Sequence, residues 1–425
     1  MAQNIQPKSV PDEVLAAVCK ALKQWANGIS LQNLQSPVSG DRRIINHTLL
    51  VYFRRRGTID WTIDQMSRRG KVNRKLRDIL RIGITQILYM DGIPPAAVTD
   101  TCVRHARRTR GKKPAGFVNA LLRNLIRTGR DNWFAEIRQN APRHVRLNLS
   151  KELYDQWRQR MNKEDLERLA DLLNSPAPLT VRRRSLAQSI TPTEAPDYLT
   201  PVDAPEWLPA ADLFECRDPQ AFFKSDAFIN QQYYVQDPAT LLAPALLDPY
   251  PEELVADLCA APGGKTLLMA ELADNKATII AGDRSSKRLQ RLLDNMPSEG
   301  RIVPVAGDAA IPYLKAQSLD AILLDVPCSN TGVIRRRPDV KWRFTRQNLQ
   351  DIVKLQKNIL AATATAVRPG GRLVYSTCSI EPEENSEQVQ NFCNRHENFR
   401  VSSERLLLPS EDHDGAYAAV LQKIR

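Results

Sequence analysis

The chain has 425 residues, more than a single hydrophobic core usually serves, and this length indicates two or three domains. Its hydrophobic content of 42% is ordinary for a globular protein, and no run of about 18 apolar residues is present, which excludes a transmembrane helix. The first residues, MAQNIQPKSVPDEV, lack the apolar core of a signal peptide, so we expect a cytoplasmic protein.

Charge is distributed unevenly along the chain. Residues 1–130 hold 24 Lys and Arg against 8 Asp and Glu, a net charge of +16. The remaining residues hold 36 against 40, a net charge of −4, so the whole excess of +12 comes from the first third. An idle solvated face could carry such charge, but segregation of this size favours a polyanionic partner such as nucleic acid.

Apolar spacing predicts an all-helical domain over residues 1–145. A ten-residue stretch, 104–113, contains six Lys and Arg. That is more than a helix C-terminus needs for capping, so we expect this basic run to contact phosphates, and Arg54–Arg56 and Arg68–Arg69 to extend its surface. Five helices are expected, over residues 11–28, 41–57, 71–92, 94–113 and 115–129.

Residues 146–230 are predicted to form a small α/β connecting subdomain, with a helical stretch over 150–176 and a strand over 179–185. From residue 231 to 425, apolar strands alternate with helices, which predicts a Rossmann-like α/β domain with a parallel sheet covered on both faces. Ligands bind such sheets at the carboxyl ends of the strands. The expected strands span 253–260, 277–283, 301–308, 320–328 and 368–379, and the helices 265–275, 285–296 and 348–367.

The loop DLCAAPGGKT, residues 257–266, is similar to a Walker A phosphate loop but departs from it. When Gly264, Lys265 and Thr266 are aligned with the end of that motif, Cys259 occupies the position of its first glycine. Cysteine lacks the backbone freedom of that glycine, so the loop is not predicted to hold a nucleoside triphosphate.

Four carboxylates are expected at successive strand ends: Asp257, Asp283, Asp308 and Asp325. They would repel a triphosphate, but they suit a cofactor with ribose hydroxyls, an exocyclic amine and positive charge. S-adenosylmethionine has all of these. NAD would need a G-x-G-x-x-G loop for its pyrophosphate, and that pattern is absent here.

None of the seven cysteines forms a C-x-x-C pair, and the five histidines lack metal spacing, so no metal site is expected. Most of the cysteines, Cys259 included, are expected to pack as small apolar residues. Cys328 and Cys378 differ, because each leaves an apolar strand for a polar turn. If their strands are neighbours, both thiols face one site.

Three motifs, DLCAAPGGKT, LLDVPCSNTGVIRRRPDVKW and VYSTCSIEPEEN, together resemble the RNA 5-methylcytosine methyltransferases. The helical third resembles the NusB-like RNA-binding domain in DRRIINHTLLVYFRRRGTID, LRDILRIGITQILYMDGIP and GFVNALLRNLIR. Asn330 stands where the family commonly has a small residue. The combination implies S-adenosylmethionine-dependent methylation of cytosine carbon 5 in small-subunit (16S) ribosomal RNA by a monomer.

The resemblance also implies roles for individual residues. It assigns Cys378 as the nucleophile that adds to cytosine carbon 6, and Cys328 as the thiol that assists breakdown of the adduct; exchange of these two roles is the alternative. Asp325 would contact either cofactor or base, and Lys265 would raise the local positive potential or pair with Asp257. The implied cofactor contacts are Cys259, Ala260, Ala261, Pro262, Gly263, Gly264 and Lys265, with Asp283 at the ribose and Asp308 near the adenine.

Basic residues interleaved with an aromatic one follow Cys328, and we expect the segment 335–343 to hold RNA beside the site. Two other functions compete with the enzyme. A non-catalytic RNA-binding assembly factor would not need both Cys328 and Cys378, and an NTP-dependent RNA enzyme would not carry Cys259 in its phosphate loop. A DNA substrate is a third possibility, which the NusB-like third makes less favoured than RNA.

Overall fold

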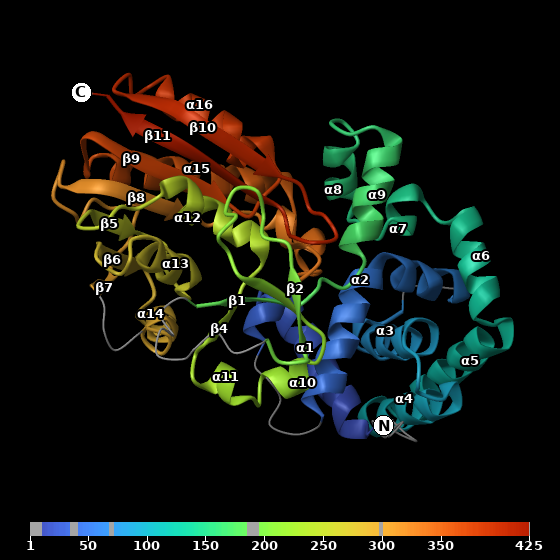
Figure 1. Ribbon diagram of the computed structural model, residues 1–425. Coiled ribbons are helices and arrows are strands. Elements are labelled where there is room, and N and C mark those ends of the chain that lie inside the picture. The colour runs from blue at the N-terminus through green and yellow to red at the C-terminus, as the bar shows by residue number, and fades with distance from the viewer. Residues whose placement is uncertain (1–10, 35–40, 68–71, 185–194, 297–300, 425) are drawn as a thin grey trace. The chain divides into compact units, whose positions relative to one another are not determined.

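Figure 1 shows a computed structural model of the chain, which describes residues 11–34, 41–67, 72–184, 195–296 and 301–424. By packing, the chain divides into two compact units. The first comprises Met1–Ser175 together with Ile334–Phe344, and the second comprises Pro176–Val333 together with Thr345–Arg425. The ranges 1–145, 146–230 and 231–425 divide the chain differently, and their boundaries stay a prediction.

The first unit is helical, as predicted, and its first five helices fall on the five expected ranges. They pack around a core that includes Val14, Val18, Phe53 and Leu122, all fully buried. The helices are α1 (Asp12–Ala26), α2 (Arg42–Met66), α3 (Arg74–Tyr89), α4 (Pro95–Arg110), α5 (Lys112–Thr128), α6 (Arg130–Asn140), α7 (Arg143–Arg146), α8 (Lys151–Trp157) and α9 (Lys163–Leu173).

Helix α2 is longer than predicted, because it continues through Gly57 instead of ending there. A Cβ atom added at Gly57 would lie 3.1 Å from the Trp342 ring and 3.3 Å from the Asn148 side chain. The glycine therefore marks a close packing contact in the middle of the helix, and the sequence pattern of a helix end was misleading here.

The segment Ile334–Phe344 is packed into this helical unit. Lys341 is fully buried, and its Nζ donates hydrogen bonds to the Arg54 carbonyl oxygen at 3.0 Å and to Asn174 Oδ1 at 2.5 Å. The Trp342 indole donates to the Phe53 carbonyl oxygen at 2.7 Å. The prediction that these two side chains grip RNA is wrong, because their polar groups are engaged by the helical unit.

The second unit begins with a small antiparallel sheet in the order β2-β3-β1-β4. Its strand β1 confirms the strand expected near residue 180. The strands are β1 (Thr180–Arg183), β2 (Leu199–Val202), β3 (Leu213–Cys216) and β4 (Tyr233–Val235), with the short helices α10 (Pro219–Phe222) and α11 (Asp226–Ile229) between β3 and β4.

The large sheet of this unit has the order β10-β11-β9-β8-β5-β6-β7. Strands β5 to β9 pair in parallel, as predicted, whereas β11 runs antiparallel to both β9 and β10, so the sheet is mixed. The strands are β5 (Leu254–Asp257), β6 (Thr278–Asp283), β7 (Ile302–Ala306), β8 (Leu319–Asp325), β9 (Val367–Thr377), β10 (Phe399–Leu407) and β11 (Ala416–Lys423).

Helices cover both faces of the large sheet (Figure 1). Alternate strand residues face opposite sides, so Val255 and Leu323 join one core while Ala256 and Leu324 join the other. The first core contains residues of α12 (Leu242–Leu247), α13 (Gly264–Leu272) and α14 (Ser286–Leu293), and the second contains residues of α15 (Arg346–Ala364) and α16 (Ser386–Cys393). Within the described ranges, no helix has the length and apolarity to span a bilayer.

Candidate active site

The predicted site residues gather at one edge of the large sheet. Asp257, Asp283 and Asp325 are the last residues of β5, β6 and β8, and Asp308 follows the end of β7. Cys378 directly follows β9. Because β7, β6, β5, β8 and β9 are consecutive parallel neighbours, their carboxyl ends bring these groups to the same edge.

The loop Cys259–Lys265 joins β5 to α13. Gly263 has φ of +114°, and a Cβ atom there would lie 2.4 Å from the Leu292 side chain. A Cβ atom at Gly264 would lie 2.8 Å from the Tyr234 ring. Both glycines are among the implied cofactor contacts, and the packing of the protein itself already requires them.

Two buried polar atoms at this edge have neither a hydrogen-bond partner nor an ion-pair partner among the described residues: Asp257 Oδ1 and the Tyr313 hydroxyl. The other Asp257 oxygen accepts from Thr266 Oγ1 at 2.7 Å, and burial raises the pKa of Asp257 to about 7. Asp283 Oδ2 forms an ion pair with Arg288 Nη1 at 3.2 Å. Unpaired acceptors in a buried position suit a ligand that brings hydroxyl and amine donors, which fits the nucleoside part of S-adenosylmethionine.

Tyr313 lies at the same edge, although no sequence motif predicts it as a site residue. Its side chain lies against the backbone of Gly282 and Gly307. A Cβ atom added at Gly282 would lie 2.4 Å from the Tyr313 hydroxyl oxygen, and one added at Gly307 would lie 2.7 Å from the Tyr313 ring. Burial, together with Cys259 and the surrounding carboxylates, raises the pKa of Tyr313 to about 12. The sequence does contain a signal for a side chain packed at this position, because Ala-Gly-Asp is repeated at the ends of two strands, residues 281–283 and 306–308.

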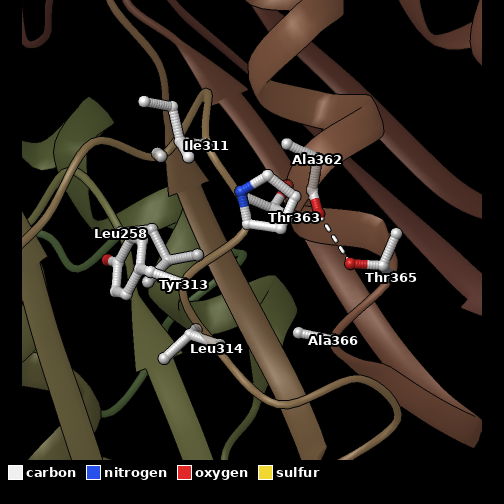
Figure 2. Close-up of a pocket in the computed structure, with 10 residues that line it drawn as sticks. Leu258, Ile311, Tyr313, Leu314, Ala362, Thr363, Thr365 and Ala366 are labelled. Carbon is white, nitrogen blue, oxygen red and sulfur yellow. Dashed lines mark hydrogen bonds between the residues drawn. The ribbon is translucent and has the colours of Figure 1, made fainter.

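Tyr313 also lines a small apolar pocket, shown in Figure 2 with Leu258 and the end of α15 around Thr363. The Thr365 hydroxyl caps this end of the helix by donating to the Ala362 carbonyl oxygen at 2.8 Å. None of the predicted catalytic or cofactor residues lines the pocket, so we assign it no ligand.

Lys265 and Asp325 form an ion pair of 2.5 Å between Nζ and Oδ2. Burial alone would lower the pKa of Lys265, but the Asp325 carboxylate and the nearby Cys378 outweigh it and raise that pKa. The ammonium therefore stays charged beside the cysteine. The alternative that Lys265 pairs with Asp257 is wrong.

The two cysteines lie together, as expected from neighbouring strands. Their Sγ atoms are 3.2 Å apart, and both side chains are half-buried. The Cys378 thiol also donates to Asn330 Oδ1 at 3.3 Å, and Asn330 Nδ2 donates to the Cys328 carbonyl oxygen at 2.7 Å. Asn330 has φ of 63° and links the two turns at the position where the family commonly has a small residue.

The cysteines differ in their electrostatic surroundings. The hydrogen bond with Cys378, burial and the charge of Glu384 raise the pKa of Cys328 well above its usual value. Cys328 therefore holds its proton, and can donate it in a hydrogen bond to the Cys378 sulfur. Burial also raises the pKa of Cys259, which agrees with the packing role predicted for that residue.

In the part of the chain that the structure describes, no three His, Cys, Asp or Glu side chains are grouped to hold an ion. In the helical unit, His105 Nδ1 lies 3.1 Å from Asp12 Oδ1.

Two family models match the chain. The model described as 16S rRNA methyltransferase RsmB/F matches residues 244–420, and the NusB family model matches residues 13–127. The first match contains every site residue discussed above, and the second lies in the helical unit.

Curated relatives and solved structures extend the match to the whole chain. A probable ribosomal RNA small subunit methyltransferase B of Synechocystis is 32% identical over 90% of this chain and 91% of its own. The ribosomal RNA small subunit methyltransferase B of Vibrio cholerae is 34% identical over 81% and 80%. In fold, the crystal structure of PH0851 matches with a TM-score of 0.76 at 24% identity, over 98% of this chain and 99% of that one. NSun6 from Pyrococcus horikoshii, solved with the S-adenosylmethionine analogue SFG, matches with a TM-score of 0.57 at 21% identity, over 65% and 98%.

Proposed function

The chain belongs to the 16S rRNA methyltransferase RsmB/F family, and from this premise we propose that it methylates carbon 5 of a cytosine in small-subunit ribosomal RNA. The observation that carries the proposal is the pair of sulfur atoms 3.2 Å apart at the ends of two parallel strands, beside the Lys265–Asp325 ion pair. We further propose that the enzyme works as a cytoplasmic monomer without a metal.

The proposed cofactor is S-adenosylmethionine, which supplies the methyl group from its sulfonium. The loop Cys259–Lys265 would hold it, with Asp283 at the ribose hydroxyls and Asp308 near the adenine. The unpaired Asp257 oxygen and the Tyr313 hydroxyl support this assignment, because each needs a partner that the described residues do not provide.

Cys378 is the proposed nucleophile. After its proton has been lost to solvent, its thiolate adds to carbon 6 of the cytosine, which makes carbon 5 electron-rich enough to accept the methyl group. The Lys265 ammonium lies within electrostatic range of this sulfur and stabilises negative charge there. The base must be unstacked or single-stranded to reach Cys378.

Cys328 is the proposed partner in release. After solvent water has accepted the carbon 5 proton, the bond between Cys378 and carbon 6 breaks, and Cys378 departs as a thiolate. Cys328 bears a proton and lies in contact with Cys378, so its S–H can stabilise the departing sulfur. The exchanged assignment is the alternative that the two cysteine variants distinguish.

Methyl transfer from labelled S-adenosylmethionine to small-subunit rRNA tests the proposal, with the wild type compared to Cys378→Ala and Cys328→Ala. We expect no transfer by Cys378→Ala, and accumulation of a covalent protein–RNA adduct by Cys328→Ala. RNA that contains 5-fluorocytidine should trap the wild-type adduct, because fluorine cannot leave carbon 5 as a proton does.

Two outcomes would redirect the assignment. An adduct that accumulates in Cys378→Ala instead would show that the two cysteines have exchanged roles. A wild-type protein that binds rRNA but transfers no methyl group to any RNA would support the non-catalytic assembly factor.

A further inference from the structure

Glu384 is a fully buried carboxylate that lies behind the two cysteines, at the end of the 3-10 turn Pro382–Glu384. Its Oε1 accepts from the Ser329 backbone N–H at 2.8 Å and from Gln356 Nε2 at 3.0 Å. Its Oε2 accepts from the Ser379 hydroxyl at 2.5 Å and from the Ser329 hydroxyl. Four donors thus converge on one carboxylate, which strongly constrains the groups that carry them.

The two serines give this network its significance, because each directly follows a site cysteine in the chain. Ser329 follows Cys328, and Ser379 follows Cys378. The serine hydroxyls lie 3.1 Å apart, close to the 3.2 Å between the cysteine sulfurs. Glu384 therefore joins two turns that come from different strands and fixes the spacing of the reactive atoms.

We propose that Glu384 is a positioning residue that holds the Cys328 and Cys378 turns together and so sets the alignment of the two thiols. It does not touch the proposed base or cofactor, and it acts through Ser329 and Ser379. The role in the reaction rests on the proposed function, but the effect on the two thiols does not.

Glu384 also has an electrostatic effect on the pair, which follows from burial. The side chain of Glu384 is enclosed, and no cation is among its four hydrogen-bond donors. Its charge contributes to the raised pKa of Cys328. A neutral side chain of the same size should therefore let Cys328 ionise at lower pH, whereas loss of a serine arm should leave that ionisation nearly unchanged.

Glu384→Gln tests the alignment and the electrostatic effect together, with Glu387→Gln on the exposed surface of α16 as the matched control. The first measurement is the pH dependence of alkylation of each cysteine in the full-length protein, followed by mass spectrometry. We expect the midpoint for Cys328 to fall in Glu384→Gln and to stay at its wild-type value in Glu387→Gln. The second measurement is single-turnover adduct formation, which should slow by roughly 10- to 100-fold in Glu384→Gln at unchanged cofactor affinity, because the thiols lose their alignment.

Ser329→Ala and Ser379→Ala each remove one hydrogen bond to Glu384 but keep its charge, so they test the alignment of the thiols separately from the charge. They also test the proposal if Glu384→Gln does not fold. Each should slow single-turnover chemistry by roughly threefold or more while the Cys328 alkylation midpoint stays in place. Wild-type rates in both serine variants, or a wild-type Cys328 midpoint in folded Glu384→Gln, would overturn the proposal. A wild type that forms no adduct would overturn the proposed function instead, and the alkylation profiles would still decide the role of Glu384.

Discussion

Two basic stretches with similar composition have opposite environments. In the basic run 104–113, Arg104, Arg107, Arg110, Lys112 and Lys113 are exposed, and Arg108 pairs with Asp12 at 2.6 Å. In the segment 335–343, Arg335 and Lys341 are buried within the helical unit. The difference lies in the residues between the charges, because Trp342 packs against the helical core and its neighbour Lys341 is buried beside it. A count of charges therefore does not identify a nucleic-acid surface.

Reversal of the Lys341 charge should have the largest effect. In Lys341→Glu, a buried carboxylate would face the Arg54 carbonyl oxygen and Asn174 Oδ1, both of which accept hydrogen bonds from Lys341 in the wild type. We expect the free energy of unfolding of the helical unit to fall by about 3–5 kcal/mol. Chemical denaturation monitored by far-UV circular dichroism measures this. Wild-type stability would show that Lys341 is not buried in solution.

Removal of the Lys341 amine should have a smaller and pH-dependent effect. Burial, with Arg55 and Arg54 nearby, lowers the pKa of Lys341 well below its usual 10.5. The unfolded chain then binds this proton more tightly than the folded chain. Wild-type stability should accordingly rise with pH between the folded pKa and 10.5.

Lys341→Met should lose that rise, and at high pH it should be about 1–3 kcal/mol less stable than the wild type because two acceptors are left without a donor. Denaturation curves at several pH values compare the two proteins. Parallel stability–pH curves would contradict the lowered pKa. Affinity for RNA should be the same in both proteins.

Charge removal in the exposed run should act on RNA binding alone. In Arg107→Ala/Arg110→Ala, we expect affinity for small-subunit rRNA to fall about tenfold. The plot of log affinity against log salt concentration should also become less steep, by the amount expected for the loss of up to two phosphate contacts. The free energy of unfolding should change by less than about 0.5 kcal/mol. Arg400→Ala, an exposed site on β10, is the control. Equal RNA affinities in the two variants would remove the basic run from the binding surface.

Local sequence patterns predicted much of the fold and of the site. Strand-end carboxylates and the two cysteines follow from apolar runs that stop at polar residues, which is a local signal. Tyr313 and Glu384 could not be found in this way, because their importance comes from groups far away in the chain that the fold brings to them. Gly57 led to a wrong prediction of a helix end for the same reason, because the glycine allows close packing against Trp342, a residue 285 positions later in the chain. Strands β10 and β11 were not anticipated, because sheet pairing with β9 is a long-range property.

The segment Ile334–Phe344 also bears on how the protein can be divided. Its neighbours in the chain belong to the second unit on both sides, so neither unit corresponds to one continuous stretch of sequence. A fragment that begins at Pro176 would carry Trp342 without the helices it packs against, and its tendency to aggregate should increase. Dissection of the protein at that boundary therefore calls for redesign of the inserted stretch, not only for a new start codon.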